Sequence, residues 1–128
     1  MILLLDTHAF LWWCAADTQL SEVARDAIAD GNNRVLVSAV SGWEIAIKAR
    51  LGKLPLPQAP AAFMAAMLTR HRFEVLPVRM AHALAEYDLP AHHNDPFDRL
   101  LIAQAKHEGL TLVSNDGQIA RYEVARLW

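Results

Sequence analysis

The sequence has one cysteine, no long apolar run and no excess of one charge. The single cysteine, Cys14, excludes an internal disulfide framework and fits a reducing compartment. The apolar start of the chain, residues 2–5, is too short for the core of a signal peptide, and no later run is long enough to cross a membrane. We therefore expect a cytoplasmic protein that has no membrane partner.

The charge balance excludes a general attraction to polyanions. The chain carries 14 acidic and 12 basic residues, which gives a formal net charge of -2. A nucleic acid would have to be bound through a local basic patch or through a metal ion. A length of 128 residues with 54% hydrophobic residues fits one globular domain with a substantial core, which we place at residues 1-128.

Apolar runs alternate along the chain with segments of helical spacing. The apolar runs predict strands at 2–5, 34–37, 73–76 and 110–114, with a last edge strand at 122–127. Spacing, capping residues and glycine stops predict helices at 9–16, 20–30, 39–51, 61–71, 79–87 and 96–108. This alternation indicates an α/β fold with three α/β/α layers, in which helices cover both faces of a central, mostly parallel sheet of four to five strands.

Four acidic residues fall near the edge of the sheet at which its strands end. Asp6 directly follows the first strand, and Glu44 lies on the helix after the second. Asp98 lies in the first turn of the helix at 96–108, and Asp116 follows the next strand. Because the working sites of parallel sheets lie at the carboxyl ends of the strands, we expect these four side chains to converge.

Each acid also has a purely structural explanation. Asp6 could cap the helix that follows it, and Asp116 could be a turn residue within an Asn-Asp-Gly sequence. Glu44 could form a surface pair with Lys48, four residues further on. Against that, Glu44 shares a helical line with apolar residues, which predicts that it is buried; these residues are Val40, Ile47 and Leu51.

The segment around residue 96 contains two acids with competing roles. Asp95 suits the N-cap position of a helix, and Pro96 suits its first turn. Asp98 stands where the partner of a capping box would lie, although Glu or Gln is more usual there. Taken alone, this segment is therefore explained by helix capping.

The four acids together indicate a chemical role. Three or four carboxylates brought close together would repel one another and raise one another's pKa values unless a cation neutralised them. Oxygen ligands without cysteine suit Mg²⁺ or Mn²⁺ better than Zn²⁺. Such a site can activate a water molecule and offset the charge of a phosphodiester. The pattern predicts a hydrolytic metal site, whose ion would supply the positive charge that the chain lacks.

Four segments resemble the acidic motifs of PIN domains, and in particular those of the VapC-type toxins of bacterial toxin–antitoxin pairs. In chain order they are LLLDTH at 3–8, SAVSGWEI at 38–45, DPFDRLLIA at 95–103 and VSND at 113–116. The resemblance implies a PIN-like fold and a magnesium-dependent ribonuclease that cleaves RNA. It also implies a homodimer that is inhibited by a cognate antitoxin protein.

The resemblance assigns roles to individual residues. Ser114 has the place of a supporting hydroxyl, with Thr7 as a further supporting residue. Asp98 matches the family's acid followed by an apolar helix, which leaves Asp95 as the supporting cap. The metal-binding and catalytic set that the resemblance implies is Asp6, Glu44, Asp98 and Asp116.

Basic residues and histidines near these motifs are candidates for RNA contact. His93 could help to position a phosphate, and the basic candidates are Lys48, Arg50, Lys53 and Arg99. A solvated helix face explains the basic group equally well. A transition-metal site that uses His8, His92 and His93 is disfavoured because adjacent histidines tend to point apart. The remaining histidines are expected on helix surfaces, at His71, His82 and His107.

Two other functions remain as alternatives. The LLLDT sequence also begins the motif of phosphoaspartate phosphatases, but that motif needs a second Asp where His8 stands. A catalytically weak interaction module could keep the same fold and partner surface. The use of three tryptophans is also open between core, dimer contact and antitoxin groove; they are Trp12, Trp13 and Trp43.

Overall fold

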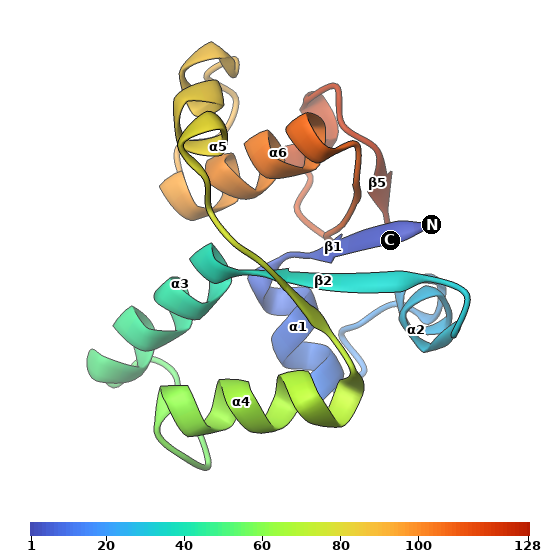
Figure 1. The fold of residues 1–128 in the computed structure, drawn as a ribbon, viewed down its shortest axis with the longest axis vertical. Coiled ribbons are helices and arrows are strands. Elements are labelled where there is room, and N and C mark those ends of the chain that lie inside the picture. Colours follow the sequence, from blue (N-terminus) through green and yellow to red (C-terminus); the bar gives the residue numbers. More distant parts are fainter.

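The computed structural model describes residues 1–128 as an α/β fold around one five-stranded sheet (Figure 1). The strands are β1 (Ile2–Leu5), β2 (Arg34–Ser38), β3 (Glu74–Leu76), β4 (Thr111–Val113) and β5 (Arg126–Leu127). The α-helices are α1 (Thr7–Cys14), α2 (Glu22–Ala29), α3 (Ala39–Arg50), α4 (Pro60–His71), α5 (Met80–Ala85) and α6 (Pro96–Glu108). Two short 3-10 helices, η1 (Glu86–Asp88) and η2 (Ile119–Arg121), complete the chain.

The sheet has the order β3-β2-β1-β4-β5, and every pair of neighbouring strands is parallel. Strand β1 is central, since Leu5 pairs with Val37 of β2 on one side and with Val113 of β4 on the other. This confirms the predicted parallel sheet and the predicted central position of the first apolar run. The edge strand predicted at 122–127 is shorter, because only Arg126 and Leu127 pair with β4.

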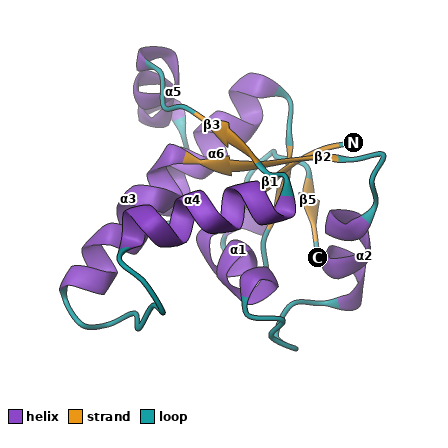
Figure 2. Ribbon diagram, turned by 60° about the horizontal axis from the view of Figure 1, so that its bottom comes forward, coloured by secondary structure: helices purple, strands orange, loops and turns teal.

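The sheet separates two apolar cores, and alternate residues of β1 supply both. Leu3 and Leu5 point into the core beneath α1, α2 and α4, whereas Leu4 points into the core beneath α6. Figures 1 and 2 show α5 and α6 on one side of the sheet and α1, α2 and α4 on the opposite side. The three predicted layers are therefore present. None of the helices is both long enough and apolar enough to span a bilayer.

Helix α3 extends from the carboxyl edge of the sheet and contacts both cores. Ser38 caps it by accepting a hydrogen bond from the backbone N–H of Val40 at 3.1 Å. Val40 packs into the core beneath α6, and Ile45 packs into the opposite core. The helical line predicted to be buried is correct only near the start of the helix, because Leu51 at its end is 54% exposed.

The three tryptophans in question have different environments. Trp12 and Trp13 of α1 pack against the core beneath α1, and the Trp12 ring lies 5.8 Å from that of Trp128. Cys14 follows on the same helix, and burial raises the pKa of its thiol to about 11, which fits the predicted core role. Trp43 of α3 is instead 62% exposed.

Helix α6 begins and ends with the capping residues that its sequence predicts. The Asp95 carboxylate accepts hydrogen bonds from the backbone N–H groups of Phe97 at 2.8 Å and Asp98 at 3.2 Å. Pro96 occupies the first turn, where its missing N–H costs nothing. Gly109 ends the helix at φ +67°, a left-handed conformation that glycine adopts without strain.

The cap makes Asp95 a stability residue, and a pair of substitutions tests this role. Asp95→Ala should lower the free energy of unfolding by about 1 kcal/mol, because two backbone N–H groups lose their acceptor. Asp95→Asn removes the same charge but keeps a capping oxygen, and should stay close to the parent protein. Urea unfolding measures both variants; equal stability of the Ala and Asn variants would contradict the capping role.

Candidate active site

The candidate site lies where the chain reverses its direction of progress across the sheet. From β1 the chain adds β2 and β3 on one side, and only later β4 and β5 on the other. The carboxyl ends of β1 and β4 therefore form a topological switch point, which is where open α/β sheets bind ligands. Asp6 leaves β1 at this point, and its N–H donates to the Val113 carbonyl at 3.0 Å.

Asp6 is nearly buried, with 6% of its surface exposed. Its carboxylate caps α1 by accepting the backbone N–H of Ala9 at 2.7 Å, so the predicted capping role is real. Burial raises the pKa of Asp6, while hydrogen bonds from the Ser114 hydroxyl and the Ala9 N–H oppose the rise. Ser114 also accepts the N–H of Asp116 at 3.0 Å, so one buried hydroxyl positions two of the acids.

His93 joins the other two aspartates of the site. Its Nε2 lies 2.6 Å from Oδ2 of Asp116 and 3.1 Å from Oδ2 of Asp98. Its Nδ1 accepts the backbone N–H of Asp95 at 3.0 Å, so Nε2 carries the ring proton and donates it toward the two carboxylates. The sequence predicted a phosphate contact for His93, whereas the structure places its ring between two acids of the site.

Asp98 has a strongly raised pKa. Burial raises its pKa to about 7, and the charges of Asp95, Asp6 and Glu44 add to the rise while His93 opposes it. Negative charge from several segments of the chain therefore converges on Asp98. The repulsion predicted from the sequence is present in the fold.

Glu44 enters the site from α3 with both carboxylate oxygens already engaged. Its Oε1 accepts a hydrogen bond from the Thr7 hydroxyl at 2.7 Å, and its Oε2 lies 2.5 Å from the Lys48 ammonium. Only 4% of its surface is exposed. Glu44 is thus both buried and paired with Lys48, which combines the two roles that the sequence left as alternatives. The Thr7 hydroxyl thus helps to hold the Glu44 carboxylate in place.

The loop before Asp95 is held by residues that the sequence did not single out. The Tyr122 hydroxyl accepts the backbone N–H groups of His92 at 3.1 Å and His93 at 2.8 Å, and donates to the Pro90 carbonyl at 2.8 Å. No local signal marks Tyr122, because it lies about thirty residues further along the chain. Its position in space alone makes it an anchor for the site.

The residues predicted to contact RNA differ in whether their charges are already paired within the protein. Lys48 pairs with Glu44, whereas Arg50 and Lys53 are exposed and form no ion pair. The Arg99 guanidinium pairs with Glu86 and donates to the carbonyls of the loop before Asp95. This geometry favours a structural role for Arg99 over the predicted phosphate contact.

The donors at the site suit a hard divalent cation. Ligand atoms of His93, Asp98 and Asp116 lie within 4.8 Å of one another, and Asp6 and Glu44 add their charges. Because the Nε2 of His93 carries a proton, this ring cannot offer a lone pair there. Carboxylate oxygens remain, and they are the ligands that Mg²⁺ and Mn²⁺ prefer. The uncompensated charge at Asp98 fits such an ion.

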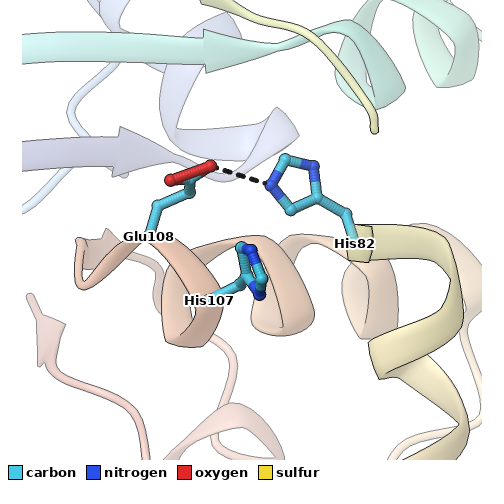
Figure 3. A group of neighbouring side chains, drawn as sticks. All are labelled: His82, His107 and Glu108. Carbon is cyan, nitrogen blue, oxygen red and sulfur yellow. Dashed lines mark hydrogen bonds and ion pairs between the residues drawn. The ribbon is translucent and has the colours of Figure 1, made fainter. Parts of the chain in front are cut away.

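A second group of possible ligands lies between α5 and α6, where His82, His107 and Glu108 gather (Figure 3). The Nδ1 of His82 accepts the backbone N–H of Arg79 at 3.0 Å, so its Nε2 carries the proton and donates to Glu108 at 3.0 Å. Metal binding at that nitrogen would need the opposite tautomer. The group therefore ties α5 to α6, and His82, with none of its surface exposed, is not the surface residue that the sequence predicted.

Comparison with known sequences agrees with the motifs. Residues 3–125 match the family model of the PIN domain. The chain is 32% identical over 126 residues to ribonuclease VapC22 of Mycobacterium tuberculosis, covering 96% of this chain and 93% of that protein. It is 43% identical over 58 residues to ribonuclease VapC16 of the same organism, an alignment that spans 45% of this chain and 41% of that protein.

Solved structures show the same fold. A chain of VapBC2 from Rickettsia felis, crystallised with a promoter DNA fragment, superposes with a TM-score of 0.72 at 17% identity, covering 98% of this chain and 97% of that chain. A chain of DNA-bound VapBC from Salmonella typhimurium superposes with a TM-score of 0.67 at 19% identity, covering 98% of this chain and 96% of that chain. A chain of FitAcB from Neisseria gonorrhoeae superposes with a TM-score of 0.65 at 20% identity, covering 98% of this chain and 96% of that chain. The chain therefore belongs to the PIN-domain family, in the group that contains the VapC ribonucleases.

Proposed function

We propose that this protein is a metal-dependent endoribonuclease and the toxin of a toxin–antitoxin pair. The observation that carries the proposal is the convergence of Asp6, Asp98 and Asp116 at the switch point of the sheet, with Glu44 beside them. Relatives named as ribonucleases support RNA as the substrate. The reaction is hydrolysis of a phosphodiester bond.

The carboxylates of Asp6, Asp98 and Asp116 would hold Mg²⁺ or Mn²⁺, with Glu44 completing the set. The ion would lower the pKa of a bound water and offset negative charge on the phosphate. The chain itself keeps these acids in place. Ser114 orients Asp6, and the Nε2–H of His93 orients Asp116 and Asp98. Hydrogen-bonded supports of this kind fix the direction of ligand oxygens.

RNA would reach the site over the exposed basic residues at the end of α3. Arg50 and Lys53 are exposed, and neither forms an ion pair within the chain. Contacts from such residues to phosphates position RNA without reading its sequence, and they weaken as salt rises. His93 and Lys48 are held by acids of the site, so Arg50 and Lys53 are the better candidates.

A cognate antitoxin is the proposed protein partner. Solved relatives of this fold are described as VapBC and FitAcB complexes. An open apolar hollow of about 380 Å³ lies beside α1, lined by Trp12, Leu54, Leu56 and Phe63 among others, and by His8 close to the site. An apolar segment of the antitoxin would bury this surface, which gives Trp12 the groove role left open by the sequence.

A homodimer is the second proposed assembly. Met80 and Leu84 lie one helical turn apart on α5 and are 74% and 66% exposed, and Tyr87 on η1 is 88% exposed. An exposed apolar stripe of this kind on a small domain is typical of a protein contact. A second copy of the chain would cover it.

Substitution of the acids tests the catalytic proposal. Asp6→Asn and Asp98→Asn should each reduce magnesium-dependent cleavage of RNA by about 100-fold or more, because each removes a metal ligand. Asp26→Asn, at an exposed position on α2, is the matched control and should cleave as the parent does. Circular dichroism checks that each variant is folded. Full activity in both site variants would overturn the assignment.

The raised pKa of Asp98 predicts how pH changes the effect of a metal ion on the unfolding temperature. Its folded-state pKa of about 7 exceeds the ordinary value of 3.8, so the metal-free protein loses stability as pH rises between these values. A cation favours the ionised carboxylate and offsets that loss. We therefore expect Mg²⁺ to raise the unfolding temperature more at about pH 8 than at about pH 6.

Two variants locate this pH effect. Asp98→Asn should remove most of the difference between the two pH values, whereas Asp26→Asn should keep it. Thermal unfolding monitored by fluorescence gives the comparison. An equal shift with Mg²⁺ at both pH values in the parent protein would contradict a metal ligand with a raised pKa.

The dimer surface is tested separately from catalysis. Leu84→Asp places a charge in the exposed stripe of α5 and should shift the protein from dimer to monomer in sedimentation velocity. Val23→Asp puts the same charge on an exposed apolar position of α2 and should leave the assembly unchanged. A monomeric parent protein, or a dimeric Leu84→Asp variant, would show that the stripe is not the dimer contact.

A further inference from the structure

Trp43 is an exposed aromatic residue at the rim of the acidic site. It directly precedes Glu44 on α3; 62% of its surface is exposed, against 4% for Glu44. Its aromatic neighbour is Phe97, which directly precedes Asp98 on α6. Two helices that each supply an acid to the site thus each carry an aromatic residue at the preceding sequence position.

The rings of Trp43 and Phe97 pack against each other. Their centroids lie 5.4 Å apart with an angle of 74° between the planes, an edge-to-face arrangement. Such pairs are favourable and orient the rings relative to each other. Phe97 is partly buried against the core beneath α6, so it can hold the indole while most of the Trp43 surface stays open to solvent.

The core does not explain Trp43. Trp12 and Trp13 pack against the core beneath α1, whereas Trp43 contributes to neither of the two cores. Keeping a large aromatic surface in water is unfavourable, and tryptophan in such a position is typical of a binding surface. This surface lies where α3 meets the first turn of α6, the two helices that bring Glu44 and Asp98 together, which indicates a ligand that enters the candidate site.

The charges around the site indicate what that ligand needs. Lys48 pairs with Glu44, Arg99 pairs with Glu86, and His93 is held between Asp98 and Asp116. The rim therefore offers few free cations to a phosphate backbone. Stacking of a base on an aromatic ring needs no charge, and a single stacked base typically strengthens binding by roughly 10- to 100-fold.

We propose that Trp43, held by Phe97, stacks on an unpaired base of RNA beside the scissile phosphate. This inference rests on the proposed ribonuclease function and adds a base-contacting residue to it. Bases in a duplex are already stacked on one another, whereas unpaired bases can turn outward onto an aromatic side chain. Trp43 would therefore contact the substrate at a base that is not paired.

The binding test uses the Asp98→Asn protein, which leaves the RNA probe intact. Trp43→Ala in this background should weaken binding of a short single-stranded oligonucleotide of mixed sequence by roughly 10-fold, and Trp43→Phe should retain most of the affinity. Leu51→Ala removes an exposed apolar side chain from the end of the same helix and should have no effect. Tryptophan emission should be quenched by RNA in the parent background and much less in the Trp43→Phe variant.

Kinetics separate this role from catalysis. In the otherwise unaltered protein, Trp43→Ala should raise KM for unpaired RNA by roughly 10-fold and leave kcat within about twofold, because the acids stay in place. A duplex of the same sequence should be a poor substrate for both proteins. Thermal unfolding checks that the Trp43 variants fold, and sedimentation velocity records their assembly.

Three results would overturn the inference. Unchanged RNA affinity and KM in Trp43→Ala would remove the stacking role while leaving the ribonuclease proposal intact. A change of oligomeric state with unchanged RNA affinity would show that Trp43 is a protein contact. Absence of RNA binding and cleavage in the protein with Trp43 intact would overturn the proposed function and this inference together.

Discussion

The burial of carboxylates close to one another at the carboxyl edge of the sheet is the constraint on which the rest of the site depends. Asp6, Asp98 and Asp116 come from three segments of the chain, and burial raises the pKa values of Asp6 and Asp98, with repulsion from neighbouring acids adding to the rise. The protein compensates only in part. Capping of α1 occupies one oxygen of Asp6, and His93 shares one N–H between Asp98 and Asp116. A divalent cation would favour the ionised form of Asp98 and so offset this cost in stability.

The same compensation shapes how a protein of net charge -2 could bind a polyanion. Nearby cations and donors are used within the protein, as with Lys48 on Glu44 and Arg99 on Glu86. Attraction for a phosphate backbone must then come from a bound ion, from Arg50 and Lys53 further along α3, or from contacts that need no charge. The exposed ring of Trp43 belongs to the last kind, which is why its position beside Glu44 matters for the proposed substrate.

Much of the fold could be predicted because its signals are local. The apolar run of β1, the Ser38 cap of α3, and the Asp95 cap and Gly109 stop of α6 each depend on neighbouring residues. The five parallel strands follow from the alternation of these elements. The expected edge strand at the end of the chain is present but limited to Arg126–Leu127. Tyr122, which the prediction placed in that strand, ends η2 and bonds to the site loop instead.

The element order, the caps and the positions of the acids relative to strand ends could be predicted because they depend on residues within a few positions of one another. Which groups share a partner depends on how distant segments pack. His82 is buried because Arg79 and Glu108 satisfy both ring nitrogens, and His93 serves two acids because Asp95 fixes its tautomer. The sequence does not distinguish Trp12 from Trp43, yet only Trp12 packs against a core. Such differences arise from contacts between distant segments, which no local pattern encodes.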